Sequence, residues 1–323
     1  MKKILAIALI LSIWACKEQK KEPSIADTMK TYTIGQMMDN ESVAGGSFSP
    51  DKSKLLVSSN RSGIYNMYTV PTSGGDMMPV TQSDSSSVFA ISYFPKDARM
   101  LFRMDNNGDE IYHIFVRDTD GSHKDLTPEE GARSLFYQWS EDKTAFFYGS
   151  NKRDNRFVDL YKMDLESLTS KLIYQNNDGY DVGVVSPDEK YVALSKSINT
   201  NDSDLYLYNL ESDELMQINK TQSGNYPQDF APDGSALYYT TDDGSEFSYL
   251  MKYNLADASY EKAMQRDWDI SGSYFTQNGT YQVTYINEDA KNTIEVKEVA
   301  TGENIDLPTV ENMELTSVSF SDD

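Results

Sequence analysis

The two histidines, His113 and His123, are the side chains best suited to acid–base chemistry in this chain of 323 residues. In a serine hydrolase, a histidine base needs a serine hydroxyl to deprotonate and a carboxylate to orient its ring. An α/β-hydrolase nucleophile also requires the pattern Gly-x-Ser-x-Gly, because its strained turn accepts only small neighbours. The nearest matches, Gly45-Gly46-Ser47 and Gly272-Ser273, lack the second glycine. We therefore predict no catalytic residue and expect the chain to be inactive as a hydrolase on its own.

Three acidic turns could in principle offer oxygen ligands to calcium: residues 105–110 (DNNGDE), 118–121 (DTDG) and 201–204 (NDSD). Calcium needs six or more oxygens, and the EF-hand loop arranges them in the order D-x-[DN]-x-[DN]-G, which none of the three follows. Asp-Gly and Asn-Gly pairs are also what tight hairpin turns require. We predict hairpin turns at these positions, with neither a metal nor a cofactor bound.

These residues are set in a repeat with a period of about 45 residues. A four-residue corner, apolar or aromatic at its first position and acidic or amide at its last, occurs seven times, and the spacing is always 45 or 46 residues. A fixed period of this size indicates a repeat architecture. The corners are Phe48-Ser49-Pro50-Asp51, Phe94-Pro95-Lys96-Asp97, Trp139-Ser140-Glu141-Asp142, Val185-Ser186-Pro187-Asp188, Phe230-Ala231-Pro232-Asp233, Phe275-Thr276-Gln277-Asn278 and Phe320-Ser321-Asp322-Asp323.

The fourth repeat shows how each unit is built. Apolar runs at 182–185, 191–194, 205–208 and 215–218 are separated by clusters of Ser, Pro, Asp, Asn and Glu. β-branched and aromatic residues favour strands, and these polar clusters favour turns. Four strands in about 45 residues are typical of a β-propeller blade. The runs are too short for the helices of armadillo-type repeats. The Gly-His pair of WD40 repeats is absent, and the one Trp-Asp pair, Trp268-Asp269, is not repeated.

The chain begins with a segment that resembles a bacterial export signal. Lys2-Lys3 precede the apolar run Ile4–Ile13, which is too short to span a bilayer, since a span needs about 20 residues. Cys16 is the only cysteine, and Ile13-Trp14-Ala15-Cys16 resembles a lipobox, although Trp14 departs from that pattern. We predict a signal peptide over residues 1–15, lipidation of Cys16 and a flexible polar tether over residues 16–30. An ordinary cleaved signal with a stray cysteine is the alternative.

Composition limits the classes of partner. Lys and Arg number 29 and Asp and Glu 51, which gives a net charge of −22, so the surface repels nucleic acids. A single cysteine allows no disulfide within the chain, so stability must come from packing and from blade closure. We expect no nucleic-acid partner and a membrane association only through a lipid anchor.

The blade sequences resemble the N-terminal propeller of prolyl oligopeptidase-family (S9) serine peptidases, in particular bacterial lipoprotein members. The resemblance covers nearly all of residues 30–323 and is carried by residues 46–51 (GSFSPD), 201–208 (NDSDLYLY), and 230–234 (FAPDG) followed by 237–239 (LYY). It implies a propeller that restricts substrate access to short peptides, with Ser, Asp and His of the triad on a separate α/β-hydrolase domain. Some dipeptidyl-peptidase relatives hold the substrate's amino terminus with a glutamate pair, but no motif around Glu129-Glu130 supports such a role here.

We therefore expect an all-β fold, a β-propeller over residues 31–323 with six four-stranded blades and the first strand, 314–320, of a truncated seventh. The resemblance implies the non-catalytic, substrate-gating propeller of an S9-type peptidase whose hydrolase domain is absent from this chain. We expect it to be exported and lipid-anchored in the bacterial cell envelope, with a peptide substrate or protein partner on the propeller face. The alternative is a TolB-like envelope lipoprotein that acts as a protein- or peptide-binding scaffold, and a weaker one is a glycan- or metabolite-binding lipoprotein.

Overall fold

The computed structural model describes residues 30–309, 311 and 313–321. The chain divides into two compact units, Met1–Glu41 and Ser42–Asp323. In the described part of the first unit, the short helix α3 (Ile34–Met38) begins at Thr33, whose side chain accepts a hydrogen bond from Gln36 N while the Gln36 side chain accepts one from Thr33 N. The predicted signal peptide, Cys16 and nearly all of the predicted tether lie outside the described residues. In the part of the chain that is described, no helix has the length and hydropathy needed to cross a membrane.

The second unit contains six antiparallel sheets of four strands, each sheet formed by strands consecutive in the sequence. Blades 1 to 3 consist of β1 (Val43–Phe48), β2 (Lys54–Ser59), β3 (Asn66–Pro71), β4 (Met78–Pro79); β5 (Val88–Tyr93), β6 (Met100–Met104), β7 (His113–Arg117), β8 (His123–Asp125); and β9 (Ser134–Trp139), β10 (Ala145–Ser150), β11 (Asp159–Asp164), β12 (Ser170–Tyr174). Blades 4 to 6 consist of β13 (Asp181–Val185), β14 (Tyr191–Ser197), β15 (Ser203–Asn209), β16 (Leu215–Gln217); β17 (Asn225–Phe230), β18 (Ala236–Thr241), β19 (Tyr249–Asn254), β20 (Tyr260–Met264); and β21 (Asp269–Phe275), β22 (Tyr281–Glu288), β23 (Lys291–Glu298), β24 (Asn304–Ile305).

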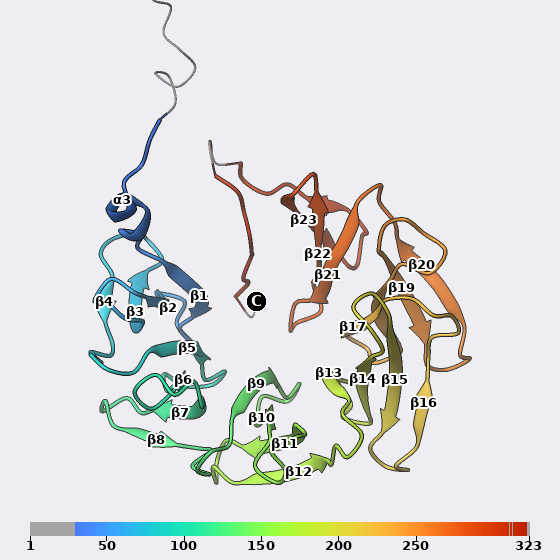
Figure 1. Cartoon of the computed structure of the whole chain (residues 1–323), viewed down its shortest axis with the longest axis horizontal. Helices are drawn as coiled ribbons and strands as arrows, with labels where there is room; N and C mark the ends of the chain where they lie inside the picture. Colours follow the sequence, from blue (N-terminus) through green and yellow to red (C-terminus); the bar gives the residue numbers. More distant parts are fainter. Residues whose placement is uncertain (1–29, 310, 312, 322–323) are drawn as a thin grey trace, which may run out of the picture. The chain divides into compact units, whose positions relative to one another are not determined.

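Within this unit the six sheets follow one another around a ring, with the first strand of each blade innermost (Figure 1). The predicted all-β propeller with six complete blades is therefore confirmed, and the four strands expected in the fourth repeat are β13 to β16. His123 follows the pair Asp120-Gly121, so the sequence predicts it in the hairpin turn. It begins the outer strand β8 instead, because the turn ends at Ser122, whose N–H donates to Asp120 Oδ1.

The recurring corner joins each inner strand to the next strand of its blade. In blade 1, Ser49 Oγ donates to Asp51 Oδ1 at 2.6 Å and accepts from Lys54 N at 3.0 Å, while Ser53 N donates to the same carboxylate oxygen. The Ser-x-Asp part of the sequence thus makes a turn held by its own side chains. The Ser49 and Ser53 hydroxyls lower the pKa of Asp51 to about 2. The same pattern at Ser140 lowers the pKa of Asp142 to about 2.

Apolar side chains of neighbouring blades form one buried cluster at each of five seams. Phe94 and Leu101 of blade 2, for example, pack with Phe146 and Tyr148 of blade 3. The clusters bridge blades 1 and 2, 2 and 3, 3 and 4, 4 and 5, and 5 and 6. The core of this propeller is therefore distributed between the sheets, as expected where each repeat can bury its apolar face only against its neighbour.

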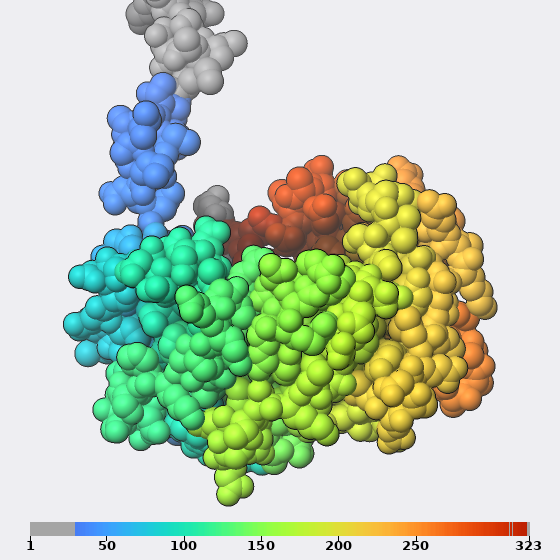
Figure 2. All heavy atoms as spheres, turned by 60° about the horizontal axis from the view of Figure 1, so that its bottom comes forward, coloured from blue at the N-terminus to red at the C-terminus, as the bar shows by residue number. Residues whose placement is uncertain are grey.

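Between blade 6 and blade 1 the ring holds an extended segment, residues 313–321, in place of a sheet (Figures 1 and 2). Phe320 lies 45 residues beyond Phe275, so this segment occupies the repeat position of a seventh inner strand. Its described residues form no strand pairing. Tyr274 Oη donates to Val318 O at 2.9 Å, and the rings of Phe320 and Tyr281 stack with centroids 5.4 Å apart. These contacts attach the segment to blade 6.

Candidate functional site

Two adjoining cavities lie at the end of the ring axis where the corners converge. Their volumes are about 380 and 450 Å³. The first is lined by blades 1, 2, 3 and 6 and by the C-terminal segment, and the second by blades 3 to 6. Trp139 and residues 274–277 line both cavities. Every blade therefore contributes to one continuous axial site, which is the size of site that binds small molecules or short peptides.

Side chains next to the corners bond the backbone of the following blade around this site. Gln138 of blade 3 accepts from Val185 N at 2.9 Å and donates to Val185 O at 3.1 Å. Ser47 Oγ of blade 1 accepts from Tyr93 N of blade 2 at 3.0 Å. These bonds satisfy backbone groups that no sheet ladder serves, and they fix each inner strand relative to its neighbour.

Blades 5 and 6 are joined by two such side chains. Gln228 Oε1 accepts from Ser273 N at 3.0 Å, and Asp229 Oδ2 accepts from Phe275 N at 2.7 Å. Burial raises the pKa of Asp229 to about 7, although the N–H groups of Phe275 and Phe230 act in the opposite direction. A carboxylate at the wall of the axial site is therefore poised to change charge near neutral pH.

Blades 4 and 5 are positioned by close packing at this end of the ring. A Cβ atom at Gly183 would lie 2.5 Å from Pro227 Cγ and 3.0 Å from Ala193 O. Only glycine lets the inner strand of blade 4 approach the ring of Pro227 this closely.

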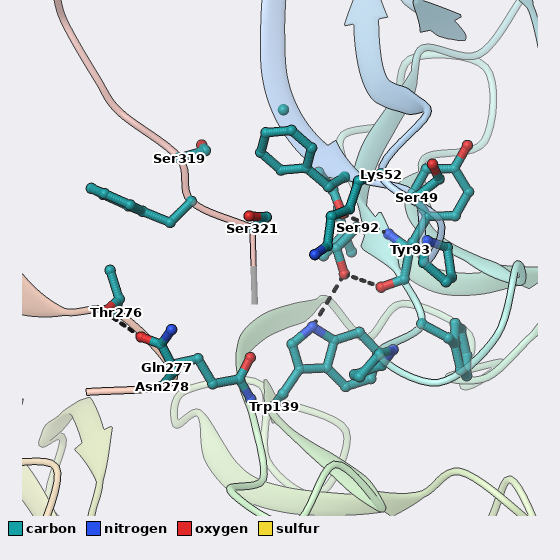
Figure 3. Close-up of a pocket in the computed structure, with 18 of the residues that line it drawn as sticks. Ser49, Lys52, Ser92, Tyr93, Trp139, Thr276, Gln277, Asn278, Ser319 and Ser321 are labelled. Atoms are coloured by element: carbon teal, nitrogen blue, oxygen red, sulfur yellow. Dashed lines mark hydrogen bonds between the residues drawn. The ribbon is translucent and has the colours of Figure 1, made fainter. Parts of the chain in front are cut away.

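The wall of the axial site combines aromatic rings with hydroxyl and amide groups. In Figure 3 the indole N–H of Trp139 points to Ser92 Oγ, a hydrogen bond of 3.1 Å, and Ser319 and Ser321 of the C-terminal segment lie across the cavity from Lys52. Neutral donors and acceptors beside aromatic faces suit a peptide backbone and its apolar side chains. We find no arrangement at this site that would perform acid–base or nucleophilic catalysis among the residues that are described.

The structure places His113 beside a carboxylate but not beside a serine hydroxyl. His113 Nδ1 lies 2.7 Å from Asp125 Oδ2, across the outer strands β7 and β8 of blade 2. His123 packs edge-on against the rings of Phe102 and Phe115. Both histidines therefore lie on blade 2 away from the axial cavities, and they support the sheet they belong to.

The acidic side chains of these turns accept hydrogen bonds from local backbone N–H groups or from other side chains. Asp120 Oδ1 accepts from Ser122 N at 2.8 Å and from Ser122 Oγ at 2.6 Å. Asp202 accepts from the side chains of Asn199 and Gln222. Residues 30–309, 311 and 313–321 contain no cluster of His, Cys, Asp and Glu that could hold a metal ion.

Neither residue of the glutamate pair lines an axial cavity. Glu129 lies 3.3 Å from Lys152 Nζ, and Glu130 is exposed. The predicted lipidation site, Cys16, lies outside the described residues and remains a prediction.

Sequence reasoning identified the corners but not the residues beside them that bond the next blade. The period contained the necessary signal, because Ser47, Gln138 and Asp229 each precede the first residue of a corner by one position. A polar residue that recurs one position before the corner, at the end of an inner strand, could have been predicted to contact the next blade. Their individual partners, two backbone N–H groups and a full peptide group, could not be read from the pattern.

Comparison with known proteins supports the architecture. A family model described as the prolyl oligopeptidase N-terminal β-propeller domain matches residues 81–323. Dipeptidyl aminopeptidase BIII of Pseudoxanthomonas mexicana is 27% identical over 183 residues, which cover 54% of this chain and 26% of that protein. The chain thus spans about a quarter of the length of this curated relative.

Solved structures with the same fold include several enzymes. A prolyl endopeptidase structure matches with a TM-score of 0.62 and 14% identity, over 83% of this chain and 43% of that one. Oligogalacturonate lyase in complex with manganese matches with a TM-score of 0.59 and 17% identity, over 80% and 74% of the two chains. Prolyl oligopeptidase B of Galerina marginata gives a TM-score of 0.58 with 14% identity, over 82% and 43%. At these identities the structural likeness establishes the fold alone.

Proposed function

This chain belongs to the family of prolyl oligopeptidase N-terminal β-propeller domains, and from that membership we propose that it is the non-catalytic, substrate-gating part of an S9-type serine peptidase. The complete protein would hydrolyse peptides by Ser-His-Asp acyl transfer, with the triad on an α/β-hydrolase domain outside this chain. The observation that carries the proposal is the family match over residues 81–323, which includes five of the six blades and the segment in the ring.

The axial site supports a gating role through its size and its chemistry. Cavities of about 380 and 450 Å³ admit a few residues of an extended peptide but no folded domain. The polar groups that join neighbouring blades hold the rim of this site in one arrangement. A rigid, narrow axial site would let short peptides through and exclude folded proteins.

The proposal includes export and attachment to a membrane of the bacterial envelope through lipid on Cys16. The basic start, the short apolar run and the single cysteine at its end support it. Metabolic labelling with a radioactive fatty acid tests this point. Label in the native chain and none in Cys16→Ser is the expected result, and equal labelling of both would contradict it.

The main test is to read the gene beyond codon 323 and to assay two proteins, the longer gene product and the 323-residue chain. We expect the frame to continue into a Gly-x-Ser-x-Gly elbow with a later Asp and His. The long product should cleave short peptides faster than folded proteins and should be inactivated by a serine-directed phosphonate. The 323-residue chain should cleave neither. Inhibitor-sensitive hydrolysis by the 323-residue chain would contradict the proposal, and a native product that stops there would favour the scaffold alternative.

A further inference from the structure

A third cavity, of about 250 Å³, is lined by blade 5 and by its connection to blade 4. Its floor and walls come from β18, β19 and β20, and its rim comes from residues 219–225 and from Asp243. It shares no lining residue with the two axial cavities. Nothing in the proposed gating role uses this cavity.

The inner wall of the cavity presents a buried phenol with an unused hydroxyl. Tyr239 is only 4% exposed, and no described residue forms a hydrogen bond with its hydroxyl. The hydroxyl groups of the two other tyrosines of the wall have hydrogen-bond partners: Tyr249 Oη donates to Asp243 O at 2.9 Å, and Tyr260 Oη donates to Ile218 O at 2.7 Å. The Tyr239 oxygen is not among the fully buried side-chain atoms that lack a partner, so it is open to the cavity and available to a ligand atom.

The rim carries one cation and one carboxylate. Lys220 Nζ lies 4.1 Å above the ring of Tyr260 and makes no ion pair or hydrogen bond with any described residue. Asp243 also lines the cavity and is exposed, and its carboxylate has no side-chain partner in the described part of the chain. The ring of Tyr260 positions the ammonium group of Lys220, and the three N–H bonds of that group remain available to a ligand.

These features together restrict the class of ligand. The rings of Tyr239, Tyr249 and Tyr260 and the thioether of Met251 require an apolar body. An ammonium group and a phenol hydroxyl in the same lining suit one carboxylate, and Asp243 in that lining disfavours a polyanion such as phosphate. The volume is at the small end of ligand sites and fits about one amino-acid residue.

We propose that this cavity binds the carboxylate of an apolar amino acid, either free or at the C-terminus of a peptide. The side chain packs against the three tyrosine rings, and the carboxylate accepts hydrogen bonds from Lys220 Nζ and Tyr239 Oη. Burial raises the pKa of Tyr239, so its phenol stays protonated and remains a donor at neutral pH. Asp243 is placed to attract the α-ammonium group of a free amino acid and to repel a ligand that has only the carboxylate.

Calorimetric titration of the full 323-residue chain tests the proposal with four probes. N-acetyl-L-phenylalanine and its C-terminal amide differ only in the carboxylate, while L-phenylalanine and Gly-Gly-Phe represent the free and the peptide-borne source. We expect the acid to bind with a dissociation constant near 1 mM, roughly what a ligand of this size achieves, and at least about tenfold more tightly than the amide. L-Phenylalanine binding more tightly than Gly-Gly-Phe would identify the free amino acid as the source, and the reverse would identify a peptide terminus.

Matched variants test whether binding depends on residues of the cavity or on other residues of the same blade. Tyr239→Phe should weaken the acid about three- to tenfold, and Lys220→Gln about tenfold. Their controls are Tyr253→Phe, whose hydroxyl faces Met216 Sδ, and Lys262→Gln, whose ammonium lies over Tyr249 outside the cavity lining. Both controls should bind as the parent does.

Asp243→Asn should tighten the binding of N-acetyl-L-phenylalanine and weaken that of L-phenylalanine, a reversal that a change in packing would not produce. Three results would overturn the proposal: no binding at about 10 mM ligand, equal binding of acid and amide, or equal effects of Tyr239→Phe and Tyr253→Phe. Thermal unfolding of each variant would show that it is folded.

Discussion

The five seams between consecutive blades and the junction between blade 6 and blade 1 are built differently. At the seam of blades 4 and 5, Phe230 and Leu237 are buried against Leu205 and Leu207. At the blade 6–blade 1 junction, no buried apolar cluster of described residues bridges the two blades. The corner residue at that position, Phe320, is half-buried on the ring of Tyr281.

The difference between the seams and the junction predicts where this ring opens first. In a repeat array, each interface contributes its own share of stability, and the weakest interface opens first. The C-terminal segment contacts blade 6 through Tyr274 and Tyr281, and a Cβ atom at Gly46 of blade 1 would lie 3.9 Å from its Ser319 Oγ. We therefore expect local opening of the ring at this junction before the five seams separate.

The largest expected effect comes from truncating the same corner position in the two environments. Phe230→Ala removes a side chain that is 2% exposed from a seam, and it should lower the free energy of unfolding by about 3–5 kcal/mol. Phe320→Ala removes a half-buried ring from the junction and should cost about 1 kcal/mol or less. Urea unfolding followed by tryptophan fluorescence measures both. Equal costs would show that the junction is as well packed as a seam.

A disulfide across the junction should remove the difference in stability between the junction and the five seams. A Cβ atom at Gly46 would lie 3.9 Å from Ser319 Oγ, a separation that a disulfide can bridge after small adjustments. In a Cys16→Ser background, Gly46→Cys with Ser319→Cys should raise the free energy of unfolding by about 2–4 kcal/mol when oxidised. The reduced form of the same protein is the control. An oxidised protein no more stable than the reduced one would mean that the junction does not limit stability.

The architecture could be predicted from sequence because its information is local and repeated. The corner Ser49-Pro50-Asp51 satisfies its own polar groups, and the same serine-to-aspartate bond recurs at Ser140 and Ser186, so a few local residues specify the turn. The seven copies, spaced by 45 or 46 residues, then predict how many inner-strand positions the described ring contains. The expectation of a strand over residues 314–320 is not met: the segment lies at the repeat position of a seventh inner strand, but it is extended chain without sheet pairing.

The sites were less predictable because their geometry depends on contacts between repeats. Asp229 reads as an ordinary polar residue in a strand, and only the structure shows that it accepts Phe275 N from the next blade. Tyr239 follows the pattern of a core residue, and its free hydroxyl is visible only when the cavity beside it is known. A pattern in one repeat identifies which residues are inside, but not which groups of another repeat they meet.

The seam between blades 5 and 6 should weaken as the pH rises, unlike the junction. The pKa of Asp229 is raised to about 7 in the folded protein, against about 3.9 in an unfolded chain. Between pH 4 and pH 7 the folded state therefore binds more protons at this position than the unfolded state, and the free energy of unfolding falls as the pH increases. Three fully expressed pKa units correspond to about 4 kcal/mol, and we expect about 2 kcal/mol for this half-buried residue.

Asp229→Asn should abolish that part of the pH dependence, so its stability relative to the parent should increase from pH 4 to pH 8. Asp233 of the same blade is the control with the opposite sign, because hydrogen bonds from Ser235 lower its pKa. The stabilisation from Asp233 is present above its ordinary pKa and is lost as the pH falls, so Asp233→Asn should be most damaging at neutral pH. Parallel pH profiles for Asp229→Asn and the parent would contradict the assignment.

The smallest effect distinguishes local opening from global unfolding. Tyr274→Phe removes only the hydrogen bond to Val318 O, worth about 1 kcal/mol, from the segment that we expect to open first. If opening of residues 313–321 precedes unfolding of the blades, the variant should keep the urea midpoint of the parent while amide exchange in this segment becomes about fivefold faster. Gln138→Ala, which removes two bonds to Val185 at a seam, should instead lower the midpoint. A lowered midpoint for Tyr274→Phe would mean that the junction unfolds together with the seams, and the ring would then be one cooperative unit.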